Sequence, residues 1–431
     1  MADYLRCEYI FEECAGMKKR LALSLLAVGF LTSGLTASPW IAAAEGSSGF
    51  KDKLPGWAKA DIEYAAGKGY MKGNEKGNFR PEATISRAEF AAILARVSNN
   101  MPDEGKTGFS SIPGWSQNEV NVAVSKGFIS PGDYPNGFNP DTPLTRRELA
   151  KWVASGLAAK DEDFKKALAD TADTLVPVAE YYKGGLNKAD NPYVSVALGT
   201  GLMAGYPDGR FGPGQTTTRA EAAVILRRFE AIQDKKPEAF QDLKEMREVG
   251  LTGTNAISLG FKYAKDQDGR EANLNRIRNV PYSLRNNIGT IKVNRFIIAN
   301  AFKAIDVKNL YGKMFIDKSY GTAFRMNTDH YEVFLEYSLT SNLNNMDAET
   351  YLSSTTSPFL CLPGFKSGTV EKYGITSLPI LGLISKNKFF KKGVETRYWG
   401  AGFVNSKVLK NGGMNGATIT INNKNFGIYM E

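Results

Sequence analysis

Residues 68–94 read KGYMKGNEKGNFRPEATISRAEFAAIL, and the same pattern returns twice further along the chain. The second copy is KGFISPGDYPNGFNPDTPLTRRELAKWV at 126–153, and the third is TGLMAGYPDGRFGPGQTTTRAEAAVIL at 200–226. In each copy a phenylalanine stands eight residues, and a proline six residues, before one arginine: Arg87, Arg146 or Arg219. Such regular spacing is typical of repeat architectures, so residues 50–232 are predicted to form three related units.

Each repeat is predicted to be a helix, a loop rich in Gly, Pro and Asn, and a second helix. A glycine stands where the first helix should end, a position that favours positive φ. The second helix opens with a capping box, Ser86-x-x-Glu89 in the first repeat, and the apolar residues after it recur at helical spacing. The equivalent residues are Gly69, Gly127 and Gly201 for the glycine, and Thr145 with Glu148 and Thr218 with Glu221 for the box.

The arginine after each capping residue needs a separate explanation. It occupies the first helical position, where the helix dipole disfavours a cation by roughly a few tenths of a kcal/mol. A guanidinium beside free helix amides makes a receptor for a carboxylate or phosphate, which is the interpretation that we favour. It implies that replacing the arginines by alanine costs little stability. The alternative is that each arginine pairs with an acid of the neighbouring repeat.

The repeats resemble S-layer homology (SLH) domains, whose hallmarks are a leading Phe and Asp, an early Trp, a G-x-x-x-G-x-F-x-P loop and an I-T-R-A-E motif. The resemblance covers about 180 of the 431 residues. The first repeat shows Phe50-Lys51-Asp52, Trp57, Gly73 and Gly77-Asn78-Phe79-Arg80-Pro81, and Ile85-Ser86-Arg87-Ala88-Glu89. The second shows Phe109, Trp115, Gly137-Phe138-Asn139-Pro140 and Leu144-Thr145-Arg146-Arg147-Glu148, and the third Gly205, Gly209-Arg210-Phe211, Pro213 and Thr217-Thr218-Arg219-Ala220-Glu221.

The resemblance implies that the units pack as an all-α, pseudo-threefold prism with grooves that bind secondary cell-wall polysaccharide. In many family members this ligand is acidic and carries pyruvate ketals, and the motif arginine meets the carboxylate. The residues that match are the arginines Arg87, Arg146 and Arg219, and the loop glycines Gly73, Gly77, Gly137, Gly205 and Gly209, which let a sugar approach the backbone. Trp57 and Trp115 either stack on a sugar or, as is more common for Trp at a helix start, belong to the core.

The three grooves are expected to be unequal, with one or two occupied, because the repeats depart from the family pattern in different ways. The second repeat has Ser110-Ser111 where the Asp is expected. The third has 73 residues between Arg146 and Arg219, against 59 between the first two motif arginines. It also lacks a clear Trp, Tyr193 being the nearest aromatic residue, and its Phe-x-Asp opening cannot be identified.

The first 44 residues are predicted to be an upstream extension followed by a signal peptide. Met17-Lys18-Lys19-Arg20 forms a basic region, residues 21–35 an apolar stretch shorter than the ~20 residues that span a bilayer, and Ala42-Ala43-Ala44 a cleavage site. The alternative for the apolar stretch is a buried core helix. After cleavage Cys361 would be the one cysteine left, which favours a Gram-positive cell surface and no remaining membrane span.

Beyond Gly250 the sequence changes to short alternating runs separated by Asn and Gly turns, which predict β-strands. Residues 331–339 alternate clearly, and 417–421 with 426–430 predict a closing hairpin. Further strand candidates are 290–298, 313–316, 377–384 and 396–404. Many short strands favour a β-sandwich, of which the immunoglobulin-like fold is one form. No family resemblance is specific enough to name here.

The excess positive charge lies entirely in this half. Residues 241–431 hold 25 Lys and Arg against 16 Asp and Glu, which accounts for the net charge of +9 of the whole chain. Outside a cell, this basic character favours acidic wall polymer or other surface proteins as partners, and not nucleic acid.

Few residues suggest catalysis, so we predict a non-enzymatic protein without cofactor or metal site. His330 is the only histidine and is expected at a surface turn. Glu332 and Glu336 fall on one strand face like a glycosidase pair, although an exposed acidic stripe is the simpler interpretation. Cys361 lies in an apolar run, which favours an inert, buried thiol. The alternative function is an SLH-anchored cell-wall hydrolase with its active site in residues 241–431.

The predicted organisation is therefore multidomain α+β. The segments are 1–44 for the extension and signal peptide, 45–108, 109–163 and 164–232 for the three SLH repeats, 233–249 for a linker, and 250–431 for the β-rich domain. We expect a secreted, S-layer-type protein that the repeats hold at the cell wall and that displays its C-terminal half in a structural or binding role.

Overall fold

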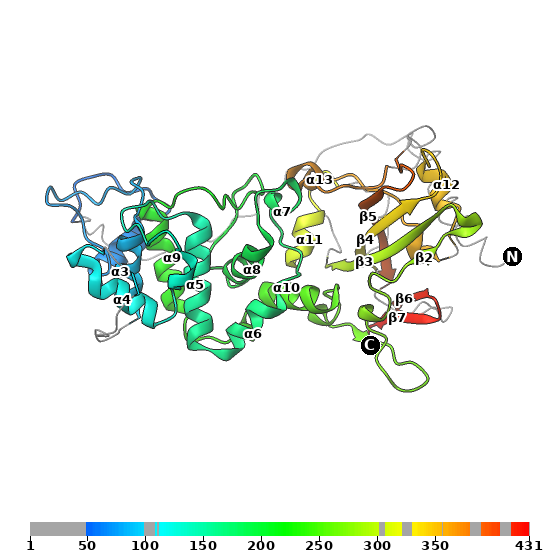
Figure 1. Cartoon of the computed structure of the whole chain (residues 1–431), viewed down its shortest axis with the longest axis horizontal. Helices are drawn as coiled ribbons and strands as arrows, with labels where there is room; N and C mark the ends of the chain where they lie inside the picture. Colours follow the sequence, from blue (N-terminus) through cyan, green and yellow to red (C-terminus); the bar gives the residue numbers. More distant parts are fainter. Residues whose placement is uncertain are drawn as a thin grey trace, which may run out of the picture.

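The computed structural model describes residues 49–98, 108–109, 112–300, 307–320, 330–355, 357–379, 389–405 and 415–430. The molecule is elongated, with the helices of the repeats at one end and the β-sheets at the other (Figure 1). The predicted signal peptide and Ser110-Ser111 lie outside the described residues. Within the described ranges, no helix combines the length and the apolar character needed to cross a membrane.

Each repeat contains the predicted pair of helices. The first helices are α2 (Lys59–Gly67), α4 (Gln117–Ser125) and α8 (Asn191–Gly199), and the second are α3 (Arg87–Val97), α5 (Arg146–Lys160) and α9 (Arg219–Ile232). The three predicted glycines follow the first helices with φ values of 73°, 73° and 75°. All three second helices begin with a complete capping box, so the prediction of their starts is confirmed.

The three repeats close a ring through backbone hydrogen bonds at its centre. Ile85 N donates to Thr217 O over 3.0 Å, Thr217 N to Leu144 O over 2.8 Å, and Leu144 N to Ile85 O over 2.8 Å. Each of these residues directly precedes a capping residue, so the three motif helices start around one point. Their buried faces share a single hydrophobic core.

Additional helices connect the third repeat with the C-terminal half. α6 (Glu162–Asp170) and α7 (Ala179–Lys183) lie between α5 and α8 and account for the longer spacing there. α10 (Gln241–Thr252) begins inside the segment expected to be a linker, and its Leu243 and Met246 are fully buried in the core of the repeats. This segment is therefore a packed element of the structure.

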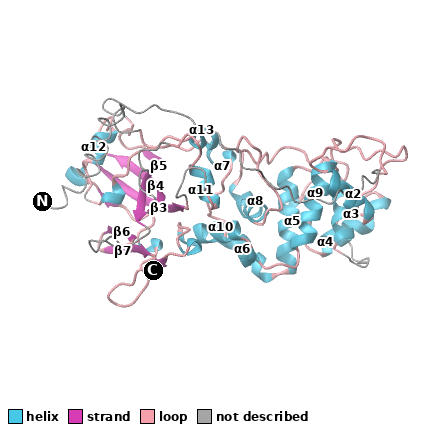
Figure 2. Ribbon diagram, turned by 180° about the vertical axis from the view of Figure 1, so that it is seen from behind, coloured by secondary structure: helices cyan, strands magenta, loops and turns pink. Residues whose placement is uncertain are grey.

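The C-terminal half contains two antiparallel sheets, so the β-rich prediction is confirmed (Figure 2). One sheet has the order β2-β3-β4-β5, formed by β2 (Tyr282–Ser283), β3 (Gly289–Ala299), β4 (His330–Ser341) and β5 (Glu395–Asn405). The other has the order β1-β7-β6, formed by β1 (Lys262–Tyr263), β7 (Lys424–Tyr429) and β6 (Gly416–Ile421). The hairpin of β6 and β7 lies at its predicted position.

The four-stranded sheet is covered on both faces. On one face Phe296 meets Phe426 of the second sheet, with 5.1 Å between the ring centroids. On the other, Phe315 of α11 (Leu310–Phe315) stacks on Phe334 at 4.4 Å. Two further short helices are α12 (Ala348–Leu352) and α13 (Gly368–Tyr373). The immunoglobulin-like sandwich stays a prediction.

One predicted strand is wrong, because residues 313–316 belong mostly to α11. A short apolar run has the same pattern in a buried strand and in a single helical turn, so the sequence does not distinguish them. Of the strand predicted at 377–384, the structure describes residues 377–379.

Candidate functional site

The start of each motif helix is occupied by the loop of the next repeat. Arg87 N donates to Thr142 O, and Ala88 N to Pro140 O, both over 3.0 Å. The amide of Glu89 is bound by the capping hydroxyl of Ser86. The same contacts join the second repeat to the third, where Arg146 N donates to Gln215 O and Arg147 N to Pro213 O. They also join the third repeat to the first, where Arg219 N donates to Ala83 O and Ala220 N to Pro81 O. The helix amides that we expected to be free for an anion are therefore already bound.

Each motif arginine also reaches into the next repeat. Arg87 donates from Nη1 to Phe138 O over 2.7 Å and from Nε to Glu148 Oε1 over 2.8 Å. Glu148 is the capping-box glutamate of the second repeat. With 16% of its side chain exposed, Arg87 acts as a clamp between two repeats.

Arg146 makes the equivalent contacts in a more buried setting, with 5% of its side chain exposed. It donates from Nε to Phe211 O and from Nη2 to Ala204 O, both over 2.8 Å. Its Nη1 lies 3.4 Å from Glu221 Oε1, and its guanidinium lies over the Tyr206 ring. These contacts account for all three nitrogens of the guanidinium.

Arg219 closes the ring onto the first repeat less tightly. It donates from Nε to Phe79 O over 2.9 Å and from Nη2 to Lys72 O over 2.7 Å. Its Nη1 lies 3.8 Å from Glu89, beyond hydrogen-bond distance, and 42% of the Glu89 side chain is exposed. Burial lowers the pKa of Arg219, and the nearby Arg80 has the same effect. This guanidinium keeps one nitrogen that can bind a further acceptor.

These contacts match the alternative interpretation of the motif arginines, in which each pairs with an acid of the neighbouring repeat. The expectation that they stand free at the helix starts is corrected, because each guanidinium spans the junction to the next loop. Direct contact of a motif arginine with a ligand stays a prediction.

Trp57 and Trp115 lie on the surface, with 61% and 56% of each residue exposed. Their assignment to the core is therefore wrong. Trp57 lies two residues before the start of α2, and Trp115 lies in the short 3-10 helix Gly114–Ser116 before α4. A solvent-exposed indole is able to stack on a sugar ring.

The contacts of α2 show where Trp57 lies relative to the motif helix α9. Asp61 contacts Arg227 at 2.8 Å and Tyr64 contacts Glu230 at 2.6 Å, so the two helices run in the same direction. Trp57, about one turn before Asp61, is therefore level with the first turns of α9. Trp115 takes the same place beside α3, because Glu119 pairs with Arg96 at 3.7 Å. Two junctions thus combine a motif arginine with an exposed tryptophan.

The junction between the second and third repeats differs. Asp190 pairs with Arg147 at 3.2 Å, and the Tyr193 ring lies under Lys151. Gly209 is covered by α13, since a Cβ atom there would lie 2.9 Å from Lys372 Cε. This junction has an acid and a covered loop where the other two have an exposed tryptophan, so the three junctions are unequal.

The predicted loop glycines mainly serve the geometry of their own loops. Gly77 and Gly137 adopt φ values of 79° and 92°. A Cβ atom at Gly73 would collide with the Phe50 ring, and one at Gly205 would approach a loop carbonyl. At Gly137 it would meet no atom within 4 Å, so this glycine lies open to an approaching ligand.

The structure also identifies the acid that opens the third repeat, which the sequence analysis missed. In the first repeat Asp52 accepts from Phe79 N and Arg80 N over 2.8 and 2.6 Å. Glu180 accepts from Phe211 N and Gly212 N in the same way, over 2.9 and 2.8 Å. The sequence did not reveal this acid, because it is Glu where the family pattern has Asp and because it follows the inserted helix α6.

Three predictions for the C-terminal half need correction. His330, Glu332 and Glu336 are buried, with 6%, 1% and 0% exposed, and so form neither a surface turn nor an exposed stripe. The reason is that both faces of β4 are covered. Cys361 is partly exposed and not fully buried. Within the described residues, no group of three or more His, Cys, Asp or Glu side chains is arranged to hold a metal ion.

Comparison with known families agrees with this architecture. The S-layer homology domain model matches residues 49–91, 109–150 and 187–223, and no family model matches the C-terminal half. The chain therefore contains three S-layer homology domains, followed by a C-terminal region that no family model matches. It is a secreted protein of the cell wall or cell surface.

Several curated relatives share the N-terminal part. S-layer protein EA1 of Bacillus anthracis is 27% identical over 56% of this chain, and an S-layer protein of Bacillus licheniformis is 27% identical over 51%. An amylopullulanase of Thermoanaerobacterium thermosulfurigenes is 28% identical over 46%. The matches span 28%, 24% and 10% of the length of these relatives.

Proposed function

We propose that the protein binds an anionic, pyruvate-ketal-bearing secondary cell-wall polysaccharide non-covalently through the grooves between its repeats. The repeats act as the anchor, and the β-rich C-terminal half is displayed at the surface. There it has a structural role in an S-layer or binds acidic wall polymer or other surface proteins.

The observation that carries this proposal is the charge around Arg219. Exposed Lys72 and Arg80 stand in the loop that Arg219 contacts. The corresponding positions are Ser130 and Asn139 in the second repeat, and Ala204 and Gly212 in the third. The groove between the third and first repeats thus combines three cationic groups with exposed Trp57, which suits an acidic sugar.

Within this groove we assign different roles to the residues. The ligand carboxylate accepts from the Nη1 of Arg219, and Lys72 and Arg80 add charge attraction. Trp57 stacks on a sugar ring. Arg87 and Arg146 hold the repeats in register, because their hydrogen-bonding groups already face protein partners.

A hydrolase is the less favoured function. Glu332 and Glu336 are four residues apart on a strand, which places their Cα atoms about 13 Å apart. The carboxyl groups of glycosidases lie within about 10 Å of each other. Both glutamates are also buried, and Glu336 is neutralised by Arg295.

The test is cosedimentation of the full chain with purified cell wall, before and after chemical removal of the ketals. Binding should be lost with the ketals and should be weakened at least tenfold by Lys72→Gln with Arg80→Gln, since charge-assisted contacts contribute about 1.5–3 kcal/mol. The matched control is Lys165→Gln with Arg270→Gln, two exposed cations elsewhere. Equal binding to ketal-free wall would refute the acidic ligand.

A further inference from the structure

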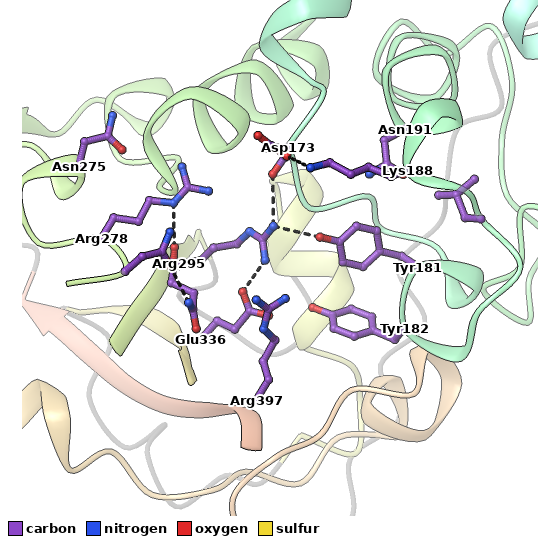
Figure 3. A pocket seen from close by; sticks show the side chains of 13 residues that line it. Asp173, Tyr181, Tyr182, Lys188, Asn191, Asn275, Arg278, Arg295, Glu336 and Arg397 are labelled. Carbon is purple, nitrogen blue, oxygen red and sulfur yellow. Dashed lines mark hydrogen bonds and ion pairs between the residues drawn. The ribbon is translucent and has the colours of Figure 1, made fainter. Parts of the chain in front are cut away.

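A cavity of about 870 Å³ lies between the third repeat and the four-stranded sheet. Tyr181 and Tyr182 form one wall, and Arg278, Arg295 and Arg397 come from the opposite side (Figure 3). This volume is in the range of small-molecule sites. Its lining residues include none of the three motif arginines and none of Trp57, Lys72 and Arg80.

A bulge in β3 shapes this cavity. The pairing of β3 with β4 shifts register between Val293 and Arg295. Val293 and Phe296 both face the core between the two sheets, so the extra residue turns Arg295 to the opposite face, where the cavity lies. Bulges commonly re-aim a side chain in this way beside functional sites.

The ion pair of Arg295 and Glu336 at the cavity keeps two polar atoms that have no hydrogen-bond partner among the described residues. Arg295, 7% exposed, forms an ion pair with the fully buried Glu336 and donates from Nη2 to Tyr181 Oη over 2.9 Å. Arg295 Nε has no hydrogen-bond partner among the described residues, and neither has Glu336 Oε1. Arg397 approaches this oxygen only to 3.7 Å. A buried polar atom without a partner is costly, so a ligand or water is expected there.

Positive charge exceeds negative charge around the cavity. Lys188, Arg278, Arg295 and Arg397 line it, against two acids, Asp173 and Glu336. Burial lowers the pKa of Arg278, and the charge of Arg295 adds to this effect. Guanidinium groups gathered in one partly buried space repel each other, and a bound anion would remove this cost.

We infer that the cavity binds an anionic saccharide. Arg278 and Arg397 bind its carboxylate or phosphate, and Asn191 and Asn279, which also line the cavity, bind its hydroxyl groups. The two tyrosines offer the aromatic surface on which a sugar ring packs. The site would let the displayed half take part in glycan binding, independently of the anchor.

Calorimetric titration of the full chain tests this site, with methyl β-D-glucuronide, glucose 6-phosphate and methyl β-D-glucoside as probes. One of the charged sugars should bind at least tenfold more tightly than the neutral glucoside, and the tighter of the two identifies the anion. Arg278→Gln with Arg397→Gln should weaken this binding about tenfold or more. Lys188→Gln, which changes a highly exposed residue at the cavity, should weaken it to a smaller extent.

The exposed Arg270→Gln is the charge-matched control and should leave binding unchanged. The variant Lys72→Gln with Arg80→Gln should also bind the probe normally, so failure of this site is distinguishable from failure of the groove. Equal affinity for the glucoside, or unchanged affinity in both cavity variants, would overturn the inference. So would the absence of binding of both charged probes.

Discussion

Arg219 Nε donates a 2.9 Å hydrogen bond to the carbonyl oxygen of Phe79, which lies 140 residues earlier in the chain. Arg146 Nε donates to Phe211 O in the same way, and Arg87 reaches Phe138 O from its Nη1. Each phenylalanine is the loop residue eight positions before the motif arginine of its own repeat. The three contacts therefore form one cyclic set that holds the ring together.

The motif arginines should contribute to stability, contrary to the expectation from their helix position. Arg146→Ala leaves the buried carbonyl of Phe211 and the carboxylate of Glu221 without their donor, and should lower the free energy of unfolding by about 2–3 kcal/mol. Denaturant unfolding measures this. Lys165→Ala, which removes a 3.4 Å pair with Glu162 between two exposed side chains, is the control and should cost less than about 1 kcal/mol. If both variants lost the same free energy of unfolding, the contacts of Arg146 would not hold the second and third repeats together.

Trp57→Ala should separate binding from stability. Because 61% of this residue is exposed, the variant should unfold close to the wild-type midpoint, while its affinity for cell wall falls roughly two- to tenfold. Trp115→Ala is the matched comparison, in a groove without the extra cations. If both variants bind the wall as the wild type does, sugar stacking is wrong.

Glu336 and Glu395 offer a comparison of a buried and an exposed ion pair in one sheet. Glu336→Ala leaves the Arg295 charge buried and should destabilise the protein by about 3–5 kcal/mol. Glu395→Ala breaks a pair with Lys292 in which both side chains are over one-third exposed, and should cost less than about 1 kcal/mol. Thermal unfolding followed by circular dichroism measures both, and similar losses would contradict the buried pairing.

Glu245 should make stability depend on pH. Burial raises its pKa above the ordinary value of 4.5, and hydrogen bonds from Asn255 and Asn309 oppose this only in part. The folded state therefore binds the proton more tightly than the unfolded state, so the wild type loses stability as pH rises from about 4.5 through the folded pKa. Glu245→Gln should gain stability relative to the wild type from about pH 4 to about pH 8. Urea unfolding across this range checks it, with Glu162→Gln as the control, and a constant difference would refute the prediction.

Features encoded by neighbouring residues were predictable from the sequence. The capping box at Ser86 and Glu89, the glycine turn at Gly69 and the long strands β3, β4 and β5 depend on local spacing. The sequence allowed the pairing of Arg87 with an acid of the next repeat but did not favour it, and the contact with Phe138, 51 positions away, could not be predicted from local spacing. The helix-dipole argument treats the helix start in isolation. In the folded protein, a carbonyl and a carboxylate of the next repeat stabilise the guanidinium that the dipole disfavours.

The position of Glu336 illustrates a second limit. An alternating strand shows that two faces differ, but it does not show that both will be covered. α11 and the second sheet cover them, and a bulge decides that Arg295 meets the glutamate. The cavity beside this pair depends on the docking of the third repeat against the sheet, which no single segment encodes.

A closed ring has no terminal unit that can be lost without consequence. Deleting any one repeat would leave a guanidinium on one neighbour and a row of loop carbonyls on the other, and both would have to be solvated or buried anew. Gene duplication and domain shuffling should therefore move these repeats as an inseparable triplet, which would be inherited as a single cassette.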